Sequence, residues 1–179
     1  INVPLLKKKY PNCAFFEDNC EGIMGGYSGV QSGSASLCSS LSFFGNKTIT
    51  SGEGGAVLTN DSSIFEFVKH ISEQSQTSEK FVHDSLGYNY RMSNLHAALL
   101  YGQLKAYDEI QAKKYEMFDR YTNLFRNYVE LQHIEKDTVH SKWMFGIKLI
   151  SQEQRNRVCR HLESRGIEWR PMFYPVSRH

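Results

Sequence analysis

The chain has 179 residues and a formal net charge of +2, from 21 basic and 19 acidic side chains. This length accommodates one large domain, or one domain and part of another, and a hydrophobic content of 40% excludes a wholly disordered chain. The weak charge disfavours nucleic acid or an anionic membrane as the main partner, and no apolar run approaches the roughly 18–20 residues that span a bilayer. Because the first residue is Ile1 rather than Met, within a predicted helix, we expect part of a longer protein.

The first half of the chain predicts strands joined by glycine-rich loops. The end of a helix at 4–9 precedes a short buried strand at 13–16, which acidic residues follow from Glu17. Acidic side chains just past the carboxyl end of a buried strand stand where open α/β sheets bind ligands. Residues 22–36, rich in Gly and Ser, predict a loop and a short hairpin. Further strands are expected at 37–44 and 56–59.

The second half predicts helices followed by a smaller α/β unit. Asn60 and Asp61 are suited to cap a helix that runs to about Ile71. From Met92 to about Tyr128, apolar residues recur at helical spacing without proline, which predicts one long helix or two joined helices. A strand–helix–strand pattern then indicates a second α/β unit. Its elements are expected at 142–150, 152–164 and 167–170.

The cysteines and histidines give no pattern of a metal site. The four cysteines have neither zinc-site spacing nor the density of a disulfide framework. The seven histidines form no HExxH or similar pair, so we predict no metal. Buried, reduced thiols are the favoured interpretation, and they predict a cytoplasmic protein.

Lys47 carries the strongest chemical signal. It lies in the segment 42–50 (SFFGNKTIT), between a predicted buried strand and a glycine-rich turn. Most loop lysines are simply exposed, but a lysine desolvated among aromatic and small residues can form a Schiff base with a carbonyl. A nucleotide-binding P-loop is excluded, because Asn46 separates Gly45 from Lys47 and the upstream glycine is missing.

Asp18 gives this lysine a possible partner. Alone, an aspartate after a strand commonly caps a helix or fixes a turn. Beside a Schiff-base lysine, a carboxylate can keep the pyridine nitrogen of pyridoxal phosphate protonated, which turns the ring into an electron sink. Ser42 and the Gly/Ser turns can supply the hydroxyl and backbone donors that a phosphate needs.

These residues, in this order, resemble the sugar-nucleotide aminotransferases of the DegT/DnrJ/EryC1/StrS family. The resemblance covers nearly the whole chain, and its motifs are 17–22 (EDNCEG), 42–55 (SFFGNKTITSGEGG), 87–94 (GYNYRMSN) and 170–175 (RPMFYP). It implies the fold type I architecture of pyridoxal-phosphate enzymes. That architecture is an α/β fold with a mostly parallel sheet flanked by helices, here with part of a smaller C-terminal α/β domain.

The resemblance also implies a role for each site residue. Lys47 would form the Schiff base and shuttle the proton, Asp18 would bind the pyridine nitrogen, and Ser42 would bind the phosphate. Glu21 would lie beside the ring hydroxyl, at a position that often holds glutamine. Asn89, otherwise an ordinary turn residue, would reach the phosphate in the other subunit's site, which implies a homodimer.

The implied reaction transfers an amino group from L-glutamate to a nucleotide-linked 4-keto-6-deoxy sugar. Within the family, Glu21 and the lysine segment are most similar to the GDP-perosamine synthases, and Arg170 and Tyr174 are expected to bind substrate. A lysine at position 47 disfavours the relatives that carry histidine there and act as 3-dehydratases. Trp169 stands where threonine is frequent, so a UDP- or dTDP-linked keto-sugar, aminated at C3 or C4, stays open.

Family members are longer than this chain, which leads to a prediction about its organisation. Residues 1–107 would be the later part of the cofactor-binding large domain, 108–130 a connecting helix, and 131–179 the first part of the small domain. A second hypothesis is that the chain as it stands is a non-catalytic fragment, lacking an N-terminal phosphate contact and the aromatic residue that stacks on the cofactor.

Overall fold

The structure, a computed structural model, describes residues 1–178. The chain divides into two compact units, one of Ile1–Arg120 with Ile134–Phe145 and the other of Tyr121–His133 with Gly146–His179. The expected domain boundaries after residues 107 and 130 stay a prediction. Among the described residues, no helix has both the length and the apolar character needed to cross a membrane.

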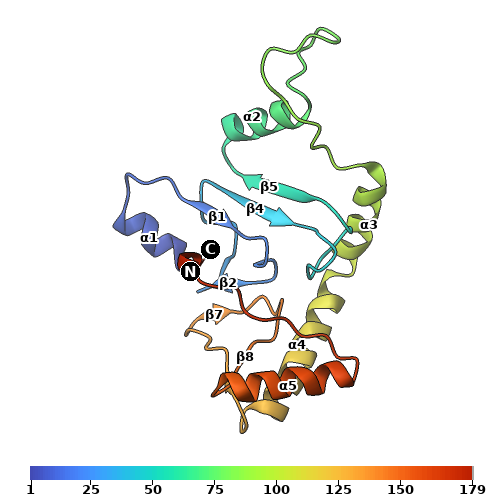
Figure 1. Ribbon diagram of the computed structural model, residues 1–179. Coiled ribbons are helices and arrows are strands. Elements are labelled where there is room, and N and C mark those ends of the chain that lie inside the picture. The colour runs from blue at the N-terminus through green and yellow to red at the C-terminus, as the bar shows by residue number, and fades with distance from the viewer. Residues whose placement is uncertain (179) are drawn as a thin grey trace. The chain divides into compact units, whose positions relative to one another are not determined.

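A three-stranded sheet in the order β1–β4–β5 is the base of the first unit (Figure 1). Its strands are β1 (Phe16–Asp18), β4 (Cys38–Ser42) and β5 (Gly55–Thr59). β1 and β4 are parallel, whereas β4 and β5 are antiparallel. The sheet that was expected to be mostly parallel is therefore mixed in this chain. Residues 43–54 return the chain directly, without the crossover helix that parallel neighbours usually need.

The first strand begins later than the apolar run at 13–16 predicts. Pairing starts where β4 offers a partner, since Leu37 donates its N–H to the Phe15 carbonyl (2.9 Å) and Phe16 lies opposite Cys38. Asp18 is consequently the last residue of β1 rather than a residue beyond it.

A second, antiparallel sheet brings a distant segment into the first unit. The expected hairpin in 22–36 is confirmed as β2 (Gly26–Tyr27) and β3 (Val30–Gln31). The other neighbour of β2 is β7 (Thr138–Val139), which gives the order β3–β2–β7. This pairing ties residues 134–145 to the unit that contains Lys47.

The helix cap predicted at Asp61 is confirmed, whereas the expectation that Ile1 lies within a helix is wrong, because Asn2 caps a helix that begins at Val3. The helix α1 (Val3–Lys9) is capped by Asn2, and α2 (Ser62–Ser72) by Asp61, whose Oδ1 accepts the Ser63 N–H (2.8 Å). The long helical stretch forms two joined helices, α3 (Asn94–Lys105) and α4 (Tyr107–Phe125), of which α4 continues into the second unit. Ala106 alone separates them, with a ψ of 12° that leaves the helical range.

The second unit contains a small sheet and one helix. β6 (Glu130–Leu131) pairs with β8 (Ile147–Lys148), and α5 (Gln152–Ser164) and a 3₁₀ turn η1 (Val176–Arg178) follow. The strand expected at 142–150 is thus only two residues long, and the strand expected at 167–170 is wrong. The Ile167 N–H donates to the Leu162 carbonyl (2.9 Å), so this segment closes the end of α5 instead of pairing with a strand.

The core of the first unit lies beneath the segment that carries Lys47. Met24, Phe43 and Ile49 are buried there, with exposed fractions of 3%, 4% and 0%. Half-buried apolar side chains from β4, β5, α3 and α4 pack around these three. Two of the core residues flank Lys47 in the sequence, so the hydrophobic core itself fixes the turn.

Candidate functional site

Lys47 stands on an anchored turn between β4 and β5. Its backbone N–H donates to the Phe44 carbonyl (2.9 Å), and the Ser51 N–H donates to the Phe43 carbonyl (3.0 Å). Ile49, two residues beyond, is completely buried. Because both flanks of the turn are held, the start of the lysine side chain has little freedom. That side chain is only 11% exposed, so Lys47 is not an ordinary surface lysine.

The Lys47 ammonium group has two described neighbours. Its Nζ forms an ion pair with a carboxylate oxygen of Glu21, whose side chain is 45% exposed. The same Nζ lies 5.0 Å from the centre of the Trp143 ring, within the range of a cation–π interaction. The residue expected beside the cofactor ring is thus, in this structure, the direct partner of the lysine.

Asp18, the last residue of β1, lies close enough to Lys47 for the lysine charge to act on its carboxylate. Its Oδ1 accepts the Cys20 N–H (3.2 Å) and the Ser40 hydroxyl (3.4 Å). Hydrogen bonds from Cys20 are the main cause that holds the pKa of Asp18 below its usual value; burial opposes them, and the Ser40 hydroxyl and the positive charge of Lys47 add smaller lowering effects. An ionised carboxylate close to the reactive amine can keep the pyridine nitrogen of the cofactor protonated.

The alternation of side chains along the strands sorts the neighbouring acidic residues into different roles. Asp18 lies opposite Ser40, and Ser42 follows two residues later on the same face of β4. Glu17 lies opposite Ser39, which is buried on the other face. The Glu17 carboxylate accepts the backbone N–H groups of residues 33, 35 and 36 at 3.0, 3.2 and 3.0 Å. Glu17 therefore holds a loop, while Asp18 remains available to a ligand.

The remaining predicted residues stand apart from this cluster in the described contacts. Ser42 is half-buried, and its Oγ accepts the Phe44 N–H (3.4 Å) at the end of β4. Asn89 is exposed in the segment after α2, where it forms an isolated bridge with Glu73. Two further predicted residues belong to the second unit. There Arg170 pairs with Glu168 (3.0 Å), and Tyr174 is 64% exposed.

The structure adds Ser40, Cys20 and Trp143 to the surroundings of the predicted residues. Ser40 could have been found from the sequence, because a serine two residues before Ser42 shares its face of a strand. Cys20 Sγ lies 3.5 Å from the Ser40 hydroxyl, and its burial, with the nearby Asp18 carboxylate, raises the pKa of this thiol. Trp143 is 97 residues from the turn it contacts, so no local pattern points to it.

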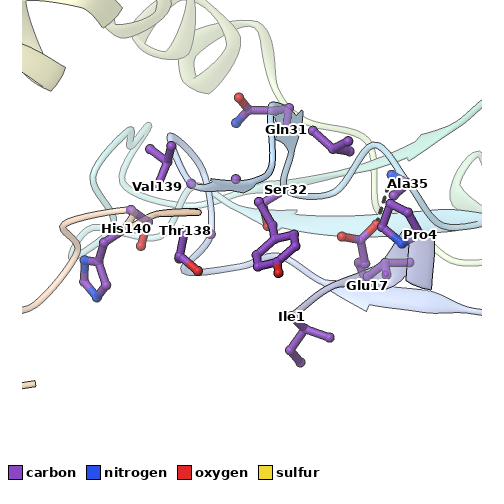
Figure 2. A pocket seen from close by; sticks show the side chains of 16 residues that line it. Ile1, Pro4, Glu17, Gln31, Ser32, Ala35, Thr138, Val139 and His140 are labelled. Carbon is purple, nitrogen blue, oxygen red and sulfur yellow. Dashed lines mark hydrogen bonds between the residues drawn. The ribbon is translucent and has the colours of Figure 1, made fainter. Parts of the chain in front are cut away.

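A pocket of about 180 Å³ lies elsewhere in the first unit, between the start of the chain and the β3–β2–β7 sheet (Figure 2). Its lining includes Ile1, Glu17, Gln31, Thr138 and His140 and none of the predicted site residues. The one carboxylate in this lining already accepts backbone hydrogen bonds, as the dashed line to Ala35 in Figure 2 shows. We therefore place the candidate site at Lys47.

The side chains around Lys47 fit pyridoxal phosphate. A shielded primary amine can react with its aldehyde, and an ionised carboxylate with a lowered pKa can bind its ring nitrogen. A hydroxyl at the end of β4 can donate to its phosphate. Lys47, Asp18 and Ser42 thus provide the groups that pyridoxal phosphate needs.

Comparisons with known proteins agree with this chemistry. Residues 8–179 match the DegT/DnrJ/EryC1/StrS aminotransferase family. The chain is 38% identical over 169 residues to a GDP-perosamine synthase of Escherichia coli O157:H7, covering 94% of this chain and 46% of that protein. It is 29% identical over 163 residues to EpsN of Bacillus subtilis (strain 168), a putative pyridoxal phosphate-dependent aminotransferase, covering 89% and 42%.

Among solved structures, the chain is similar to PseC of Helicobacter pylori, an aminotransferase involved in the biosynthesis of pseudoaminic acid. The TM-score is 0.88 at 27% identity, covering 100% of this chain and 51% of that one. This likeness confirms the predicted fold class. The chain spans about half the length of the relatives it matches.

Proposed function

We propose that this protein is a pyridoxal-phosphate-dependent aminotransferase acting on a nucleotide-linked keto-sugar. The chain belongs to the DegT/DnrJ/EryC1/StrS aminotransferase family, and this membership supports the proposal. One observation carries the proposal. Lys47 is a shielded lysine that pairs with Glu21 and lies near the ionised Asp18. A surface lysine would have neither the shielding nor the second carboxylate.

Each residue of the site would have its own role in binding the cofactor or moving the proton. Lys47 would hold the cofactor, Asp18 its ring nitrogen, and Ser42 its phosphate. When bound, the cofactor supplies an electron sink that stabilises negative charge on the substrate carbon. Lys47 would move the proton at its Nζ, taking it from one carbon and returning it to another. Glu21, the ion-pair partner of Nζ, would keep this group oriented while it carries the proton.

We propose L-glutamate as the amino donor and a GDP-linked 4-keto-6-deoxy sugar as the acceptor. The similarity to a GDP-perosamine synthase over 94% of this chain supports that choice over a UDP- or dTDP-linked sugar. Arg170 and Tyr174 would contact the substrate. In a homodimer, Asn89 would serve the site of the other subunit, which agrees with its exposure here. The expected burial of the thiols is wrong, since Cys13 is exposed and the other three cysteines are half-buried, but all four are free, and we propose a reducing compartment such as the cytoplasm.

Reductive trapping tests the cofactor and the lysine together. The full-length protein is incubated with pyridoxal phosphate, reduced with borohydride, digested and mapped by mass spectrometry. We expect the adduct on the peptide that contains Lys47 and its loss in Lys47→Ala. Lys113→Ala, which removes another lysine that pairs with a glutamate (Glu109) but lies outside the site, is the matched control and should keep the adduct. An adduct spread over many lysines, or unchanged in Lys47→Ala, would refute the assignment.

Substrate identity needs a second assay. The full-length protein is given glutamate and a panel of GDP-, UDP- and dTDP-linked keto-sugars, and the aminated products are quantified. We expect the highest turnover with the GDP-linked 4-keto-6-deoxy sugar. Higher turnover with another nucleotide would overturn the substrate and leave the reaction class standing.

A further inference from the structure

We infer that Trp143 is a positioning residue for Lys47. Its indole ring would hold the lysine side chain in place before the cofactor binds. This inference rests on the proposed function, since it concerns the lysine assigned there. It assigns a role to a residue that lies far from the family motifs in the sequence. The Trp143 side chain contacts two adjacent residues, Asn46 and Lys47.

The first contact is with the charged end of the lysine. The Lys47 Nζ lies 5.0 Å from the centre of the Trp143 ring, inside the roughly 6 Å at which a cation is attracted to an aromatic face. Tryptophan gives the strongest such attraction among aromatic side chains. Glu21 contacts the same Nζ, so a carboxylate and an aromatic ring both hold the ammonium group.

The second contact is with the backbone beside the lysine. The indole Nε1–H of Trp143 donates to the Asn46 carbonyl at 3.0 Å. One side chain therefore fixes both the peptide that precedes Lys47 and the far end of the lysine. A residue that only filled space would need neither the directed hydrogen bond nor the ring under the charge.

Trp143 is itself held in place by the first unit. It is half-buried, and its backbone carbonyl accepts a hydrogen bond from the Lys114 Nζ of α4 (3.4 Å). The strand β7 lies only a few residues before it and pairs with β2. Because the segment is anchored on both a helix and a sheet, the ring is a fixed surface rather than a mobile cover.

If Trp143 positions Lys47, the rate at which Lys47 is acylated without cofactor should depend on the Trp143 ring. An amine held between a carboxylate and a ring reacts more slowly with an acylating reagent than a free one does. Trp143→Leu removes the ring, and we expect labelling of Lys47 to accelerate about five- to thirtyfold, the range of a partly desolvated cation–π contact. Trp143→Phe keeps a ring and should change the rate less than Trp143→Leu does.

The test is built to separate positioning from folding. Full-length protein is prepared with tryptophan carrying zero, one, two or three fluorine atoms, which weakens the attraction of the ring for a cation at nearly constant shape. Trp169→Phe serves as the background, so that Trp143 is the only substituted indole in the described chain. Trp169 is a matched control, because it also makes an N–H bond, to Glu163 (2.9 Å), and lies near a cation.

Mass spectrometry of the Lys47 peptide gives the labelling rate without cofactor, and borohydride trapping is measured on the same samples. We expect the labelling rate to rise with each added fluorine, while Trp169→Phe alone leaves it unchanged. A flat fluorine series with intact trapping would overturn the role of Trp143 and leave the proposed function standing. A rising series without a trapped adduct would support the positioning contact and refute the function.

Discussion

Glu17 and Asp18 should give opposite results when they are neutralised, although they are adjacent and equally charged. Glu17 binds three backbone N–H groups of the loop at 33–36, whereas Asp18 accepts from Cys20 and Ser40 and is exposed. Removing the first acceptor leaves loop donors without a partner. Removing the second leaves the fold nearly intact but takes a charge from the site.

The contacts set the size of the effect. A hydrogen bond to a charged group contributes about 1.5–3 kcal/mol, and a buried donor left without a partner costs about 1–3 kcal/mol. Residue 33 is buried, while water can replace the acceptor for residues 35 and 36. We therefore expect Glu17→Ala to lower the free energy of unfolding by about 2–4 kcal/mol. Glu17→Gln, which keeps an acceptor oxygen, should cost about half as much, and exposed Asp18→Asn less than about 1 kcal/mol.

Urea unfolding followed by circular dichroism measures the free energies of unfolding. Titration with pyridoxal phosphate measures the affinity of each variant for the cofactor. Asp18→Asn should weaken the binding of pyridoxal phosphate about ten- to a hundredfold, the equivalent of one charge-assisted hydrogen bond. Glu17→Gln should leave it unchanged. Equal destabilisation by both variants, or equal loss of cofactor binding, would refute the assignment of the two carboxylates to opposite faces.

The same pair predicts a dependence on pH. Burial raises the pKa of Glu17, but the hydrogen bonds from the loop outweigh it, so the pKa lies below its ordinary value of 4.5. The stabilisation by Glu17 is therefore complete above pH 4.5 and is lost as the pH falls through the lowered pKa. The difference in stability between the wild type and Glu17→Gln should shrink on acidification from neutral pH. A difference that stayed constant down to pH 2 would contradict this sign.

Three further variants test the turn and the loop. Lys47→Ala should abolish the borohydride-trapped adduct while the midpoint of thermal unfolding changes by less than about 3 °C, because the lysine adds little to the core. Ile49→Ala, at a position that is 0% exposed, should lower the free energy of unfolding by about 2–5 kcal/mol in urea titrations. Gly87→Ala would place a Cβ 2.1 Å from the backbone carbon of Gln74. It should therefore destabilise the segment after α2, seen as faster proteolysis there; unchanged cleavage would show that the loop adapts.

The sequence was sufficient for the parts of the fold that local chemistry decides. Asp61 could be placed as a helix cap because an oxygen side chain before an amphipathic run satisfies free N–H groups, and the helix predicted at 152–164 is confirmed as α5. The lysine segment predicted a shielded turn correctly, since apolar residues on both sides of Lys47 require a core beneath it. The close pairing of Glu21 with Lys47 agrees with the prediction that both belong to one site.

What could not be predicted depends on partners that lie far away in the chain. The start of β1 is set by where β4 offers hydrogen bonds, not by the apolar run before it. The segment at 167–170 has strand-forming residues but closes the end of α5 instead. Trp143 is the clearest case, because it contacts Asn46 from a segment 97 residues away that follows the pairing of β7 with β2 in the chain. Local patterns carry no information on such pairings.

The contact between Asn46 and Trp143 also sets an order of events during synthesis. Chains emerge from the ribosome N-terminus first, at about 5–20 residues per second. The turn that carries Lys47 is therefore exposed to the cell for several seconds before residue 143 follows. Closing a contact over 97 residues is also a slow, non-local step in folding. A newly made Lys47 therefore lacks its aromatic neighbour until residue 143 has been synthesised, and the speed of translation through residues 48–143 sets the length of that interval.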